Sequence, residues 1–504
     1  FGACWRTMAD VGDVARSAGT GEPADGVLPS GSAPEDRGGG ALARDSRAWW
    51  GVLAGITLLA IGLRLWVASW VFPVGVTGDE AYYLEVGFQL ASGNEHVAPS
   101  SGARAAWPPG YPFFLAAFMD VRSPGASSDA LLWDVLSAQA VLGGLLVLLT
   151  GLLAAALFDR ETGWLAAAVA AIYPTFVAFS HYLFSETLFS VLLLVALLGV
   201  IAWPERRRWA LATGVGLGFG VAALTREIAI PIAVGCVLWW VLQAGRGARR
   251  IAVAHGALLL LGLALVVAPW SLRNYAALDR IVPVSNAGWL NLRSGNTLAG
   301  EDWLWPDGRA LEGFRTTYFL IPDEMDRAHY ARSQSRVLIL AEQPTWVFKK
   351  FARAVALIGN PDTYLFKKVS RGTYAGLSLP TVRAVLIAGV LSFVLIVLLG
   401  LPGVFASPSR GRRSFVFCVF GAAFLIYWVA NAAPRYRFPL MPILIAYACF
   451  SARHPRLVQR SLRGGHGLLA AVALVVFVFF CIPYFVPDAV SLWSVGTYRD
   501  PFRP

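Results

Sequence analysis

The sequence has 504 residues, of which 57% are hydrophobic and only 14% charged, and its mean hydropathy is +0.58. Soluble globular domains are less apolar and more highly charged, so this composition excludes that class and predicts a polytopic membrane protein. The formal net charge of +11 could suit nucleic acid, but the arginines cluster in short loops between apolar runs, as membrane orientation requires. A nucleic-acid partner is therefore not expected.

The first 46 residues are rich in small and polar residues and contain few large apolar ones. Such a segment cannot bury enough surface to fold, so we expect a disordered cytoplasmic tail at 1–46. We expect no secretory signal, because the first apolar run begins only near Trp49 and is long enough to span a membrane. The chain opens with Phe1, and Met8 is an alternative start.

The apolar residues gather into runs of the length that a membrane helix needs, about 20 residues. These runs predict an all-α fold with about eleven membrane helices, of which the span at 437–452 is the shortest. The predicted spans are 49–72, 131–157, 163–180, 185–203, 209–225, 228–244, 251–270, 381–404, 414–431, 437–452 and 467–487.

The basic residues predict which way the chain crosses the membrane. With the N-terminus in the cytoplasm, most loop arginines fall inside, and the short outer loops keep only Arg226, Arg435 and Arg437. This distribution follows the positive-inside rule. We therefore expect a multi-pass protein of the cell inner (plasma) membrane with a cytoplasmic N-terminus and its polar site on the outer face.

This topology divides the chain into a few parts. A catalytic membrane module at 47–270 includes a first outer loop at 73–130, and further helices follow at 381–487. Between them, an outer segment at 271–380 contains apolar runs too short to span, and the tail at 488–504 also lies outside. The short run at 107–119 and the run at 345–358 are predicted to be helices lying along the membrane interface, with buried pieces of an outer globular domain as the alternative.

The stretch "DEAYY" at 79–83 places carboxylates beside the membrane at the start of a predicted helix. Asp79 can cap that helix, or its carboxylate can act as a base or metal ligand, and capping does not exclude chemistry. Glu80, Tyr82 and Tyr83 share this helix start and are predicted to contact the substrate, with the tyrosines as wall.

A second acid, Glu186, starts the span after the turn "FSHYLFSE" at 179–186. The first helical turn favours acids, so a purely structural role is the alternative to catalysis. His181 lies five residues earlier, off the same helical face, and stays a candidate substrate or metal contact. No metal is certain, and if a divalent ion is bound its candidate ligands are Asp79, Glu186 and His181.

Four arginines lie at outer ends of spans, against the general trend: Arg226, Arg273, Arg435 and Arg437. The planar guanidinium suits phosphate, so they predict an anionic ligand, and pairing with local acids or lipid headgroups is the alternative. The stretch at 284–296 adds Asn291 and Asn296 among glycines and Trp289, as in a sugar or phosphate pocket or in a plain turn-rich loop.

Together these pieces resemble the GT-C glycosyltransferases, and in particular the phospholipid-carrier-dependent branch that includes protein O-mannosyltransferases and aminoarabinose transferases. The resemblance covers about residues 49–450 and depends on the order of several motifs. They are "DEAYY", "WPPGYP", "SETLF", "TRE", "PWSLRNY", "GWLNLRSGN" and "PRYRFPLMP".

The resemblance implies a GT-C fold and transfer of one sugar, with inversion, from a polyprenyl-phosphate donor to a hydroxyl of a lipid, glycan or protein on the outer face. It implies that Asp79 is the catalytic base, that Glu186 is the second acid, and that Arg273, Arg435 and Arg437 meet the lipid phosphate. The zinc-ligating Glu-Lys-Pro segment of the aminoarabinose branch is replaced here by Ala106-Trp107-Pro108, which leaves both a metal and a lipid A acceptor open.

Three other functions fit parts of the sequence. A secondary transporter of an anionic substrate would also use many spans and arginines, but its polar groups usually lie near mid-membrane on broken helices. An outer-face glycan polymerase or ligase would differ only in its donor. A non-enzymatic scaffold for cell-envelope assembly is the third alternative.

Overall fold

The computed structural model describes residues 38–70, 76, 78–119, 128–206, 208–296, 308–350, 368, 377–407, 409–463 and 467–477. These residues form helices joined by short turns, and the described part contains no β-strand, only an isolated bridge between Ala98 and Ala103. The all-α fold class is therefore confirmed. Of the predicted tails, 1–37 and 488–504 lie outside the described residues, whereas 38–46 belong to the first helix.

The first half of the chain forms the helices α2 to α11. They are α2 (Gly38–Trp70), α3 (Asp79–Ala91), α4 (Gly110–Phe118), α5 (Ser128–Leu157), α6 (Arg160–Ile172), α7 (Pro174–Ala178), α8 (Glu186–Arg206), α9 (Trp209–Thr225), α10 (Ala229–Gln243), η2 (Arg246–Ala248) and α11 (Arg249–Leu278).

The second half contains a group of short polar helices followed by further apolar ones. They are α12 (Ala287–Gly295), α13 (Gly308–Leu320), α14 (Glu324–Ala341), α17 (Leu379–Ala406), α18 (Arg410–Val429), η3 (Pro434–Leu440), α19 (Met441–Arg453) and α20 (Pro455–Arg463), with a further helix at Gly467–Phe477.

Six helices of the described part are long and apolar enough to cross a membrane, or seven if a bent pair near the C-terminus counts as one span. The sequence predicts about eleven, and the difference has local causes. The predicted spans 209–225 and 228–244 form helices of 17 and 15 residues, and 163–180 breaks between α6 and α7. The span 437–452 begins as the 3₁₀ helix η3 and continues as the 13-residue α19.

The apolar helices pack closely because small residues lie where they cross. On α9, a Cβ atom at Gly216 would lie 2.1 Å from the carbonyl oxygen of Leu259, and on α11 a Cβ at Gly262 would lie 2.7 Å from that of Thr213. Only glycine fits at such distances, and small residues are the usual device for close helix packing in membranes. The crossing of α9 and α11 fixes the end of α9, from which two side chains of the site project.

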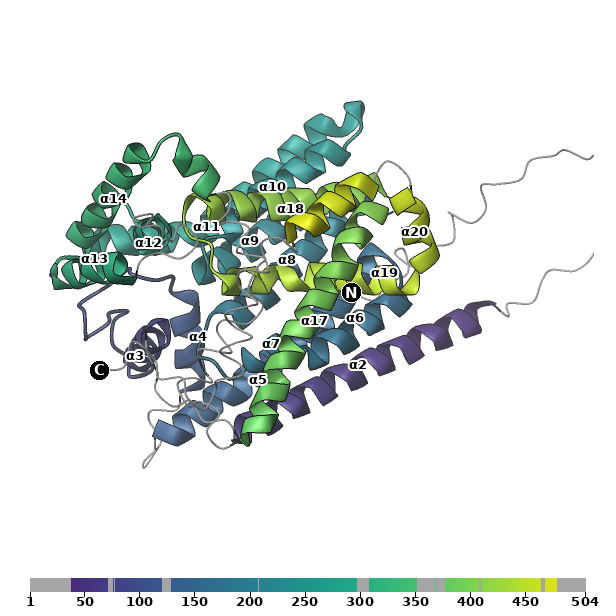
Figure 1. Cartoon of the computed structure of the whole chain (residues 1–504), viewed down its shortest axis with the longest axis horizontal. Helices are drawn as coiled ribbons and strands as arrows, with labels where there is room; N and C mark the ends of the chain where they lie inside the picture. Colours follow the sequence, from purple (N-terminus) through teal and green to yellow (C-terminus); the bar gives the residue numbers. More distant parts are fainter. Residues whose placement is uncertain are drawn as a thin grey trace, which may run out of the picture.

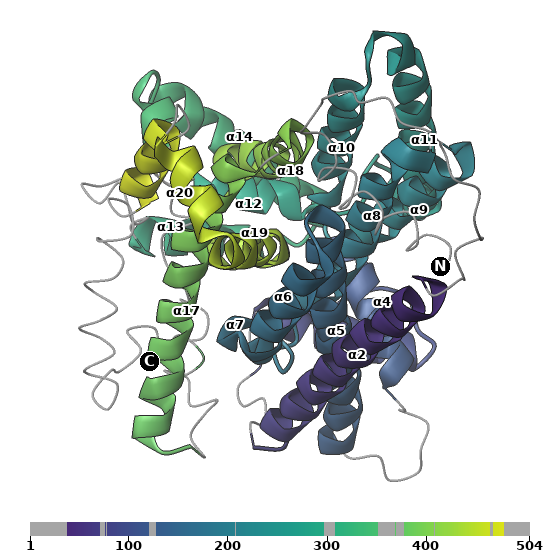
Figure 2. The same ribbon diagram turned by 90° about the vertical axis from the view of Figure 1, so that its right-hand side faces the viewer.

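The helices α3 and α12 to α14 gather at one end of the molecule, and α20 lies at the other (Figure 1). A second view shows the long helices α2 and α5 crossing beside α6, with α17 running along a separate side (Figure 2). At the first end, Glu324 of α14 accepts hydrogen bonds from the backbone amides of Arg104 and Ala105 and from Asn286. These bonds connect the loop after α3 to α14 and to the residue just before α12.

The two predicted interfacial segments differ in how much of them is described. The first, 107–119, contains helix α4, as expected. Of the second, 345–350 are helical and 351–358 lie outside the described residues. Trp346 is buried and donates to Asn296, and the Lys350 ammonium, also buried, donates to the carbonyl oxygens of Gly295 and Ala430. Residues 345–350 therefore pack against other parts of the protein. This agrees with the alternative prediction, in which the segment is a buried piece of an outer globular domain.

Candidate active site

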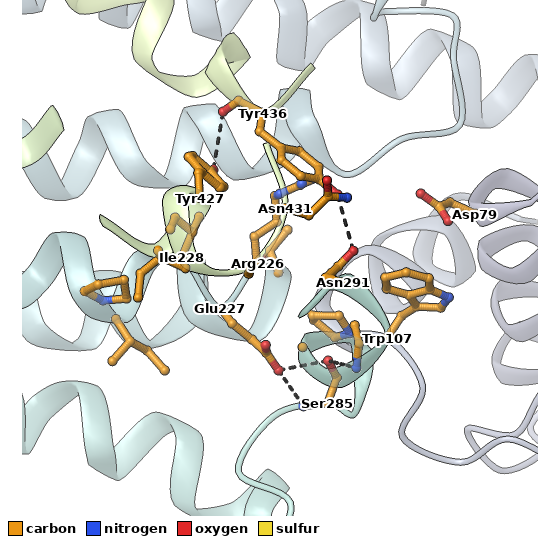
Figure 3. A pocket seen from close by; sticks show the side chains of 18 of the residues that line it. Asp79, Trp107, Arg226, Glu227, Ile228, Ser285, Asn291, Tyr427, Asn431 and Tyr436 are labelled. Atoms are coloured by element: carbon orange, nitrogen blue, oxygen red, sulfur yellow. Dashed lines mark hydrogen bonds between the residues drawn. The ribbon is translucent and has the colours of Figure 1, made fainter. Parts of the chain in front are cut away.

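A cavity of about 360 Å³ opens where the polar helices meet the ends of the apolar ones. Its walls come from α3, the segment before α4, the turn between α9 and α10, the start of α12, the end of α18 and η3 (Figure 3). The polar and aromatic side chains in its lining are Asp79, Tyr83, Trp107, Thr225, Arg226, Glu227, Ser285, Asn291, Tyr427, Asn431, Arg435 and Tyr436. Five of these are site residues predicted from the sequence.

Asp79 is the first residue of α3, and its carboxylate turns away from the helix end. Gly78, whose positive φ of 63° suits glycine, occupies the N-cap position, and no side chain caps the helix. The Asp79 carboxylate instead accepts a hydrogen bond of 2.5 Å from the guanidinium of Arg435 on η3. The side chain is 22% exposed, so it reaches the cavity while paired.

Glu186 is the first residue of α8 and is 1% exposed. Its carboxylate lies 2.8 Å from Nη1 of Arg226, the residue that ends α9, and 3.8 Å from Nε of Arg435. Arg226 also donates to the Ser185 hydroxyl. A buried carboxylate requires such partners because an uncompensated charge in a low-dielectric site is strongly destabilising.

The four charged groups therefore alternate in sign, from Asp79 through Arg435 and Glu186 to Arg226, and carry no net charge together. The two guanidinium groups also lie over the ring of Tyr436, at 5.3 Å and 5.4 Å from its centroid. A planar guanidinium held between carboxylates and an aromatic ring has fixed N–H directions. Such an arrangement can position a base next to cations that receive an anion.

Neutral polar groups surround this charged chain. Burial and the nearby Asp79 carboxylate raise the pKa of Tyr83, which keeps its phenol protonated as a hydrogen-bond donor. The Tyr436 hydroxyl lies 3.5 Å from the amide oxygen of Asn291, and the Tyr427 hydroxyl donates to the carbonyl oxygen of Tyr436. These groups offer hydroxyl and amide contacts to a polar ligand.

Glu227 contributes a third carboxyl group to the cavity. Its Oε1 accepts hydrogen bonds from the backbone N–H and the hydroxyl of Ser285, at 2.7 Å and 2.8 Å (Figure 3). Burial raises the pKa of Glu227 above its ordinary value, although the bonds from Ser285 act in the opposite direction. In the sequence, Glu227 is only a neighbouring acid and candidate partner of Arg226. In the structure Arg226 pairs with Glu186 instead, and Glu227 bonds Ser285.

The turn 179–185, just before Glu186, is held by side chains from three other helices. Gln139 of α5 donates to the carbonyl oxygens of Ser180 and Tyr182, and Arg64 of α2 donates to the Ser180 hydroxyl. Glu80 of α3 accepts from the backbone N–H of Leu183. Because these partners are buried, the turn fixes where α8 starts and hence where the Glu186 carboxylate lies.

Two of the predicted contact residues face away from the cavity. Glu80 is buried and forms an ion pair of 2.5 Å with Lys368. His181 lines a different, largely apolar cavity of about 450 Å³ between α2, α7 and α17. Burial, together with the nearby charges of Lys368 and Arg64, lowers the pKa of His181 to about 3, so the imidazole is neutral.

Four other predicted residues also make contacts outside the cavity. Arg273 donates to the carbonyl oxygens of Arg104 and His96, and so holds the loop before Trp107. Asn296 bonds to Trp346 and to the carbonyl oxygens of Leu292 and Val429. The Arg437 guanidinium lies 4.0 Å from the ring centroid of Phe393, and the ring of Tyr82 packs edge-to-face on Trp107.

The proposed metal ligands do not converge on one point. The carboxylates of Asp79 and Glu186 each pair with an arginine, and His181 lies on the other cavity. Within the described residues, no group of three or more His, Cys, Asp or Glu side chains is arranged to hold a metal ion. The donor set offered by the sequence therefore does not fit a metal in this arrangement.

Several lining residues are not among the site residues predicted from the sequence. They are Trp107, Ser285, Tyr427, Asn431 and Tyr436. Trp107 and Tyr436 lie inside the motifs "WPPGYP" and "PRYRFPLMP", next to predicted residues, so reading whole motifs would have found them. The others come from segments that meet only in the folded chain.

The chain is similar to known proteins in part of its sequence and in its fold. Residues 106–272 match the family profile of dolichyl-phosphate-mannose-protein mannosyltransferase, a range that begins in the loop before α4 and ends within α11. No curated protein matches the chain at a significant level. The match takes in Trp107, Glu186, Arg226 and Glu227.

Solved structures with a similar fold include archaeal oligosaccharyltransferases from Archaeoglobus fulgidus. AglB in complex with an inhibitory peptide and a dolichol-phosphate is 16% identical, with a TM-score of 0.51 over 89% of this chain and 56% of that one. The enzyme in its apo form is 16% identical, with a TM-score of 0.50, over 88% and 55%. The form tethered to an acceptor peptide with the NVT sequon is 15% identical, with a TM-score of 0.50, over the same shares. The chain thus spans about half the length of these structures, and the predicted resemblance to GT-C glycosyltransferases is confirmed.

Proposed function

From a GT-C fold that carries this cavity, we propose that the protein is a membrane glycosyltransferase. It transfers a single hexose or pentose from a polyprenyl-phosphate donor to a hydroxyl group of a lipid, glycan or protein, with inversion at the anomeric carbon. The observation that carries this proposal is the alternating chain of Asp79, Arg435, Glu186 and Arg226 at the cavity. It combines one accessible base with two cations, which is what such a reaction requires.

Asp79 is the base in this proposal. The acceptor oxygen forms a bond to the anomeric carbon while its proton passes to the Asp79 carboxylate. At the same time the bond between that carbon and the phosphate oxygen breaks, and its electron pair leaves with the polyprenyl phosphate. A positioned base typically contributes about 10²–10⁴-fold to the rate.

Arg226 and Arg435 receive the leaving phosphate. The phosphate is already a competent leaving group, so stabilising its developing charge replaces the need for a strong acid. Both guanidiniums are pre-oriented by carboxylates, and Arg435 touches both Asp79 and the Glu186 side of the chain. An anion placed against Arg435 competes with Asp79 for its N–H groups, which frees the base when the donor is bound.

The proposed site lies on the outer face of the inner membrane. The positive-inside distribution of arginines supports this orientation, since the loops that form the cavity carry few of them. The family profile supports a lipid-phosphate sugar as donor, and the relatives solved with dolichol-phosphate and with acceptor peptides have the same fold.

The test uses the full chain in liposomes with polyprenyl-phosphate mannose, glucose, galactose or arabinose, and with envelope lipids and glycans as acceptors. We expect free polyprenyl phosphate and a product heavier by one sugar, measured by mass spectrometry. In a deletion strain, the matching polyprenyl-phosphate sugar should accumulate and one glycan should lose one residue.

Two other outcomes would replace the proposal. A product that gains a whole oligosaccharide, and only from a diphosphate-linked donor, would identify a glycan polymerase or ligase, a function that the oligosaccharyltransferase fold also supports. Movement of an anionic sugar across the liposome membrane without any covalent product would identify a secondary transporter.

A further inference from the structure

The carboxyl group of Glu227 has no role in the transfer chemistry proposed above, yet it lines the same cavity. It follows α9 and lies on a different wall from Asp79 (Figure 3). Its neighbour Arg226 turns to Glu186, at 2.8 Å, rather than to Glu227. Across the part of the chain that is described, no ion pair of Glu227 is recorded.

The two oxygens of this carboxyl group are in different situations. Oε1 is fixed by both donors of Ser285, at 2.7 Å and 2.8 Å. Oε2 faces Gly288 on the first turn of α12, where an added Cβ would have this oxygen as its nearest neighbour, at 4.0 Å. A side chain at position 288 would therefore extend into the space in front of Oε2, and glycine leaves that space open.

A half-buried carboxyl group with one fixed and one open oxygen can accept a hydrogen bond from a ligand at the open oxygen. Leaving a polar group unpaired in a desolvated site is costly, and the carboxyl oxygen is an acceptor. A phosphate cannot satisfy it because the two groups carry the same charge, whereas a hydroxyl can. The amides of Asn291 and Asn431 and the indole of Trp107 line the same cavity and suit a sugar ring.

We propose that Glu227, held by Ser285, is a specificity-determining residue that binds one hydroxyl group of a sugar in the cavity. The inference rests on the proposed glycosyltransferase function and assigns the recognition step to the wall formed by Glu227 and Ser285. The hydroxyl belongs either to the transferred sugar or to a sugar acceptor, and the two sources are separated by the test.

The experiment pairs variants with deoxy sugars in the liposome transfer assay. Wild-type protein should use one monodeoxy analogue of its polyprenyl-phosphate sugar, or of its acceptor, about 10- to 100-fold less well in kcat/KM, as expected for a lost hydrogen bond to a charged group. Glu227→Gln and Glu227→Ala should lower kcat/KM for the full substrate by a similar factor. Neither variant should distinguish the full substrate from that same analogue.

Two further variants separate recognition from folding. Gly288→Leu keeps the carboxyl group and covers Oε2, so it should reproduce the loss of discrimination. Glu85 is the matched control, because its carboxylate is likewise held by the backbone N–H and the hydroxyl of a serine, Ser100, but lies outside the candidate cavity. Glu85→Gln should keep the discrimination of wild type.

The outcomes are distinguishable. Lost discrimination for a donor analogue assigns the hydroxyl to the transferred sugar, and lost discrimination for an acceptor analogue assigns it to the acceptor. If wild type transfers sugar but Glu227→Gln discriminates every analogue as wild type does, the recognition role is wrong while the transferase function stands. If wild type transfers no sugar from any donor, the glycosyltransferase function itself is wrong.

Discussion

Two cavities of opposite character lie near the turn 179–185, which contributes His181 to one of them and precedes Glu186, the partner of Arg226 in the lining of the other. The first is the candidate active site, where Glu186 pairs with an arginine of the lining and charged, amide and phenol groups face inward. The second is the cavity between α2, α7 and α17, whose walls are aliphatic and aromatic side chains, with His181 among them. Both cavities are of similar size, about 360 Å³ and 450 Å³.

The difference follows from how each wall satisfies its polar groups. At the first cavity, the lining residue Arg226 compensates the buried carboxylate of Glu186 behind it, so charge can persist away from water. In the second, His181 is the one titratable side chain among the described residues of the lining, and its imidazole is neutral. The turn 179–185 can lie next to charged groups and next to apolar ones because its own backbone groups are bonded to Gln139 and Glu80.

The largest expected effect comes from removing the base on the charged side. Asp79→Asn keeps the size of the side chain and loses its basicity, so sugar transfer should fall by about 10²–10⁴-fold. The measurement is initial transfer rate in liposomes. Because Gly78, and not Asp79, occupies the N-cap, thermal unfolding of the variant should stay within a few degrees of wild type.

The control for this prediction is the acid next to it in the chain. Glu80→Gln changes a carboxylate that pairs with Lys368 outside the cavity, so it should affect stability more than Asp79→Asn does. Near-normal transfer by Asp79→Asn would contradict the assignment of the base and remove the functional difference between the two cavities.

The second-largest effect tests whether the buried Glu186 carboxylate depends on Arg226 to compensate its charge. Arg226→Leu leaves the 1% exposed carboxylate of Glu186 with only the more distant Arg435, at 3.8 Å. Removing one partner of a buried pair typically costs about 3–5 kcal/mol, so the free energy of unfolding should fall by an amount near the lower end of that range. Chemical or thermal unfolding in detergent measures it.

A double variant makes this prediction specific. Arg226→Leu combined with Glu186→Leu removes both charges and should recover much of the lost stability without recovering transfer. If the loss of unfolding free energy in the double variant equals the sum of the losses in the two single variants, Arg226 and Glu186 do not stabilise each other. In that case charge compensation does not distinguish the two cavities.

A smaller effect is expected from removing the Gln139 side chain, which bonds the backbone of the turn 179–185. Gln139→Leu removes a donor to the buried carbonyl oxygens of Ser180 and Tyr182, of which the second keeps its bond from the Phe184 N–H, and it removes the acceptor of the buried Tyr111 hydroxyl. Leaving such groups unsatisfied costs about 1–3 kcal/mol. Thr150→Val is the control on the same helix, since Thr150 is equally buried but bonds only to the carbonyl oxygen of Leu146 one turn away. An equal loss in both variants would show that Gln139 has no special role in the turn.

The fold was largely predictable from the sequence because apolar run length is a local property. The run at 209–225 coincides with α9, and 228–244 differs from α10 by one residue at each end. The number of spans was less predictable, because whether a 15- or 17-residue helix crosses a membrane depends on its neighbours. The break at Tyr173, between α6 and α7, has a local cause, since Pro174 disfavours the helical conformation at the residue before it, and Arg64 of α2 bonds the carbonyl oxygens of Ala170 and Ala171 near this end of α6.

The candidate site was predictable where a charge was out of place in the sequence. Asp79, Arg226 and Arg435 were found because acids and arginines at outer span ends are unusual, and all three line the cavity. The same signal also selected Arg273, which holds loop carbonyl oxygens instead. Charge pattern indicates that a group must be satisfied, and only the fold decides whether a ligand or the backbone satisfies it.

At neutral pH the smallest effect concerns the neutral imidazole on the apolar side, because its contribution changes only in acid. Burial lowers the pKa of His181 from 6.5 to about 3, so between these values the unfolded chain binds a proton that the folded one does not. The stabilisation is complete above pH 6.5 and is lost as the pH falls towards 3, at up to about 1.4 kcal/mol per pH unit.

His181→Phe should remove this contribution, so the difference in unfolding free energy between wild type and variant should change across that pH range. Val177→Ala, on the same apolar wall, has no titratable group and should shift the free energy of unfolding equally at every pH. If the His181→Phe difference is also constant with pH, burial does not lower the pKa of His181, and the imidazole of the folded protein is protonated below about pH 6.5. A cation would then lie at both cavities, and the contrast between a charged and an apolar cavity would be lost.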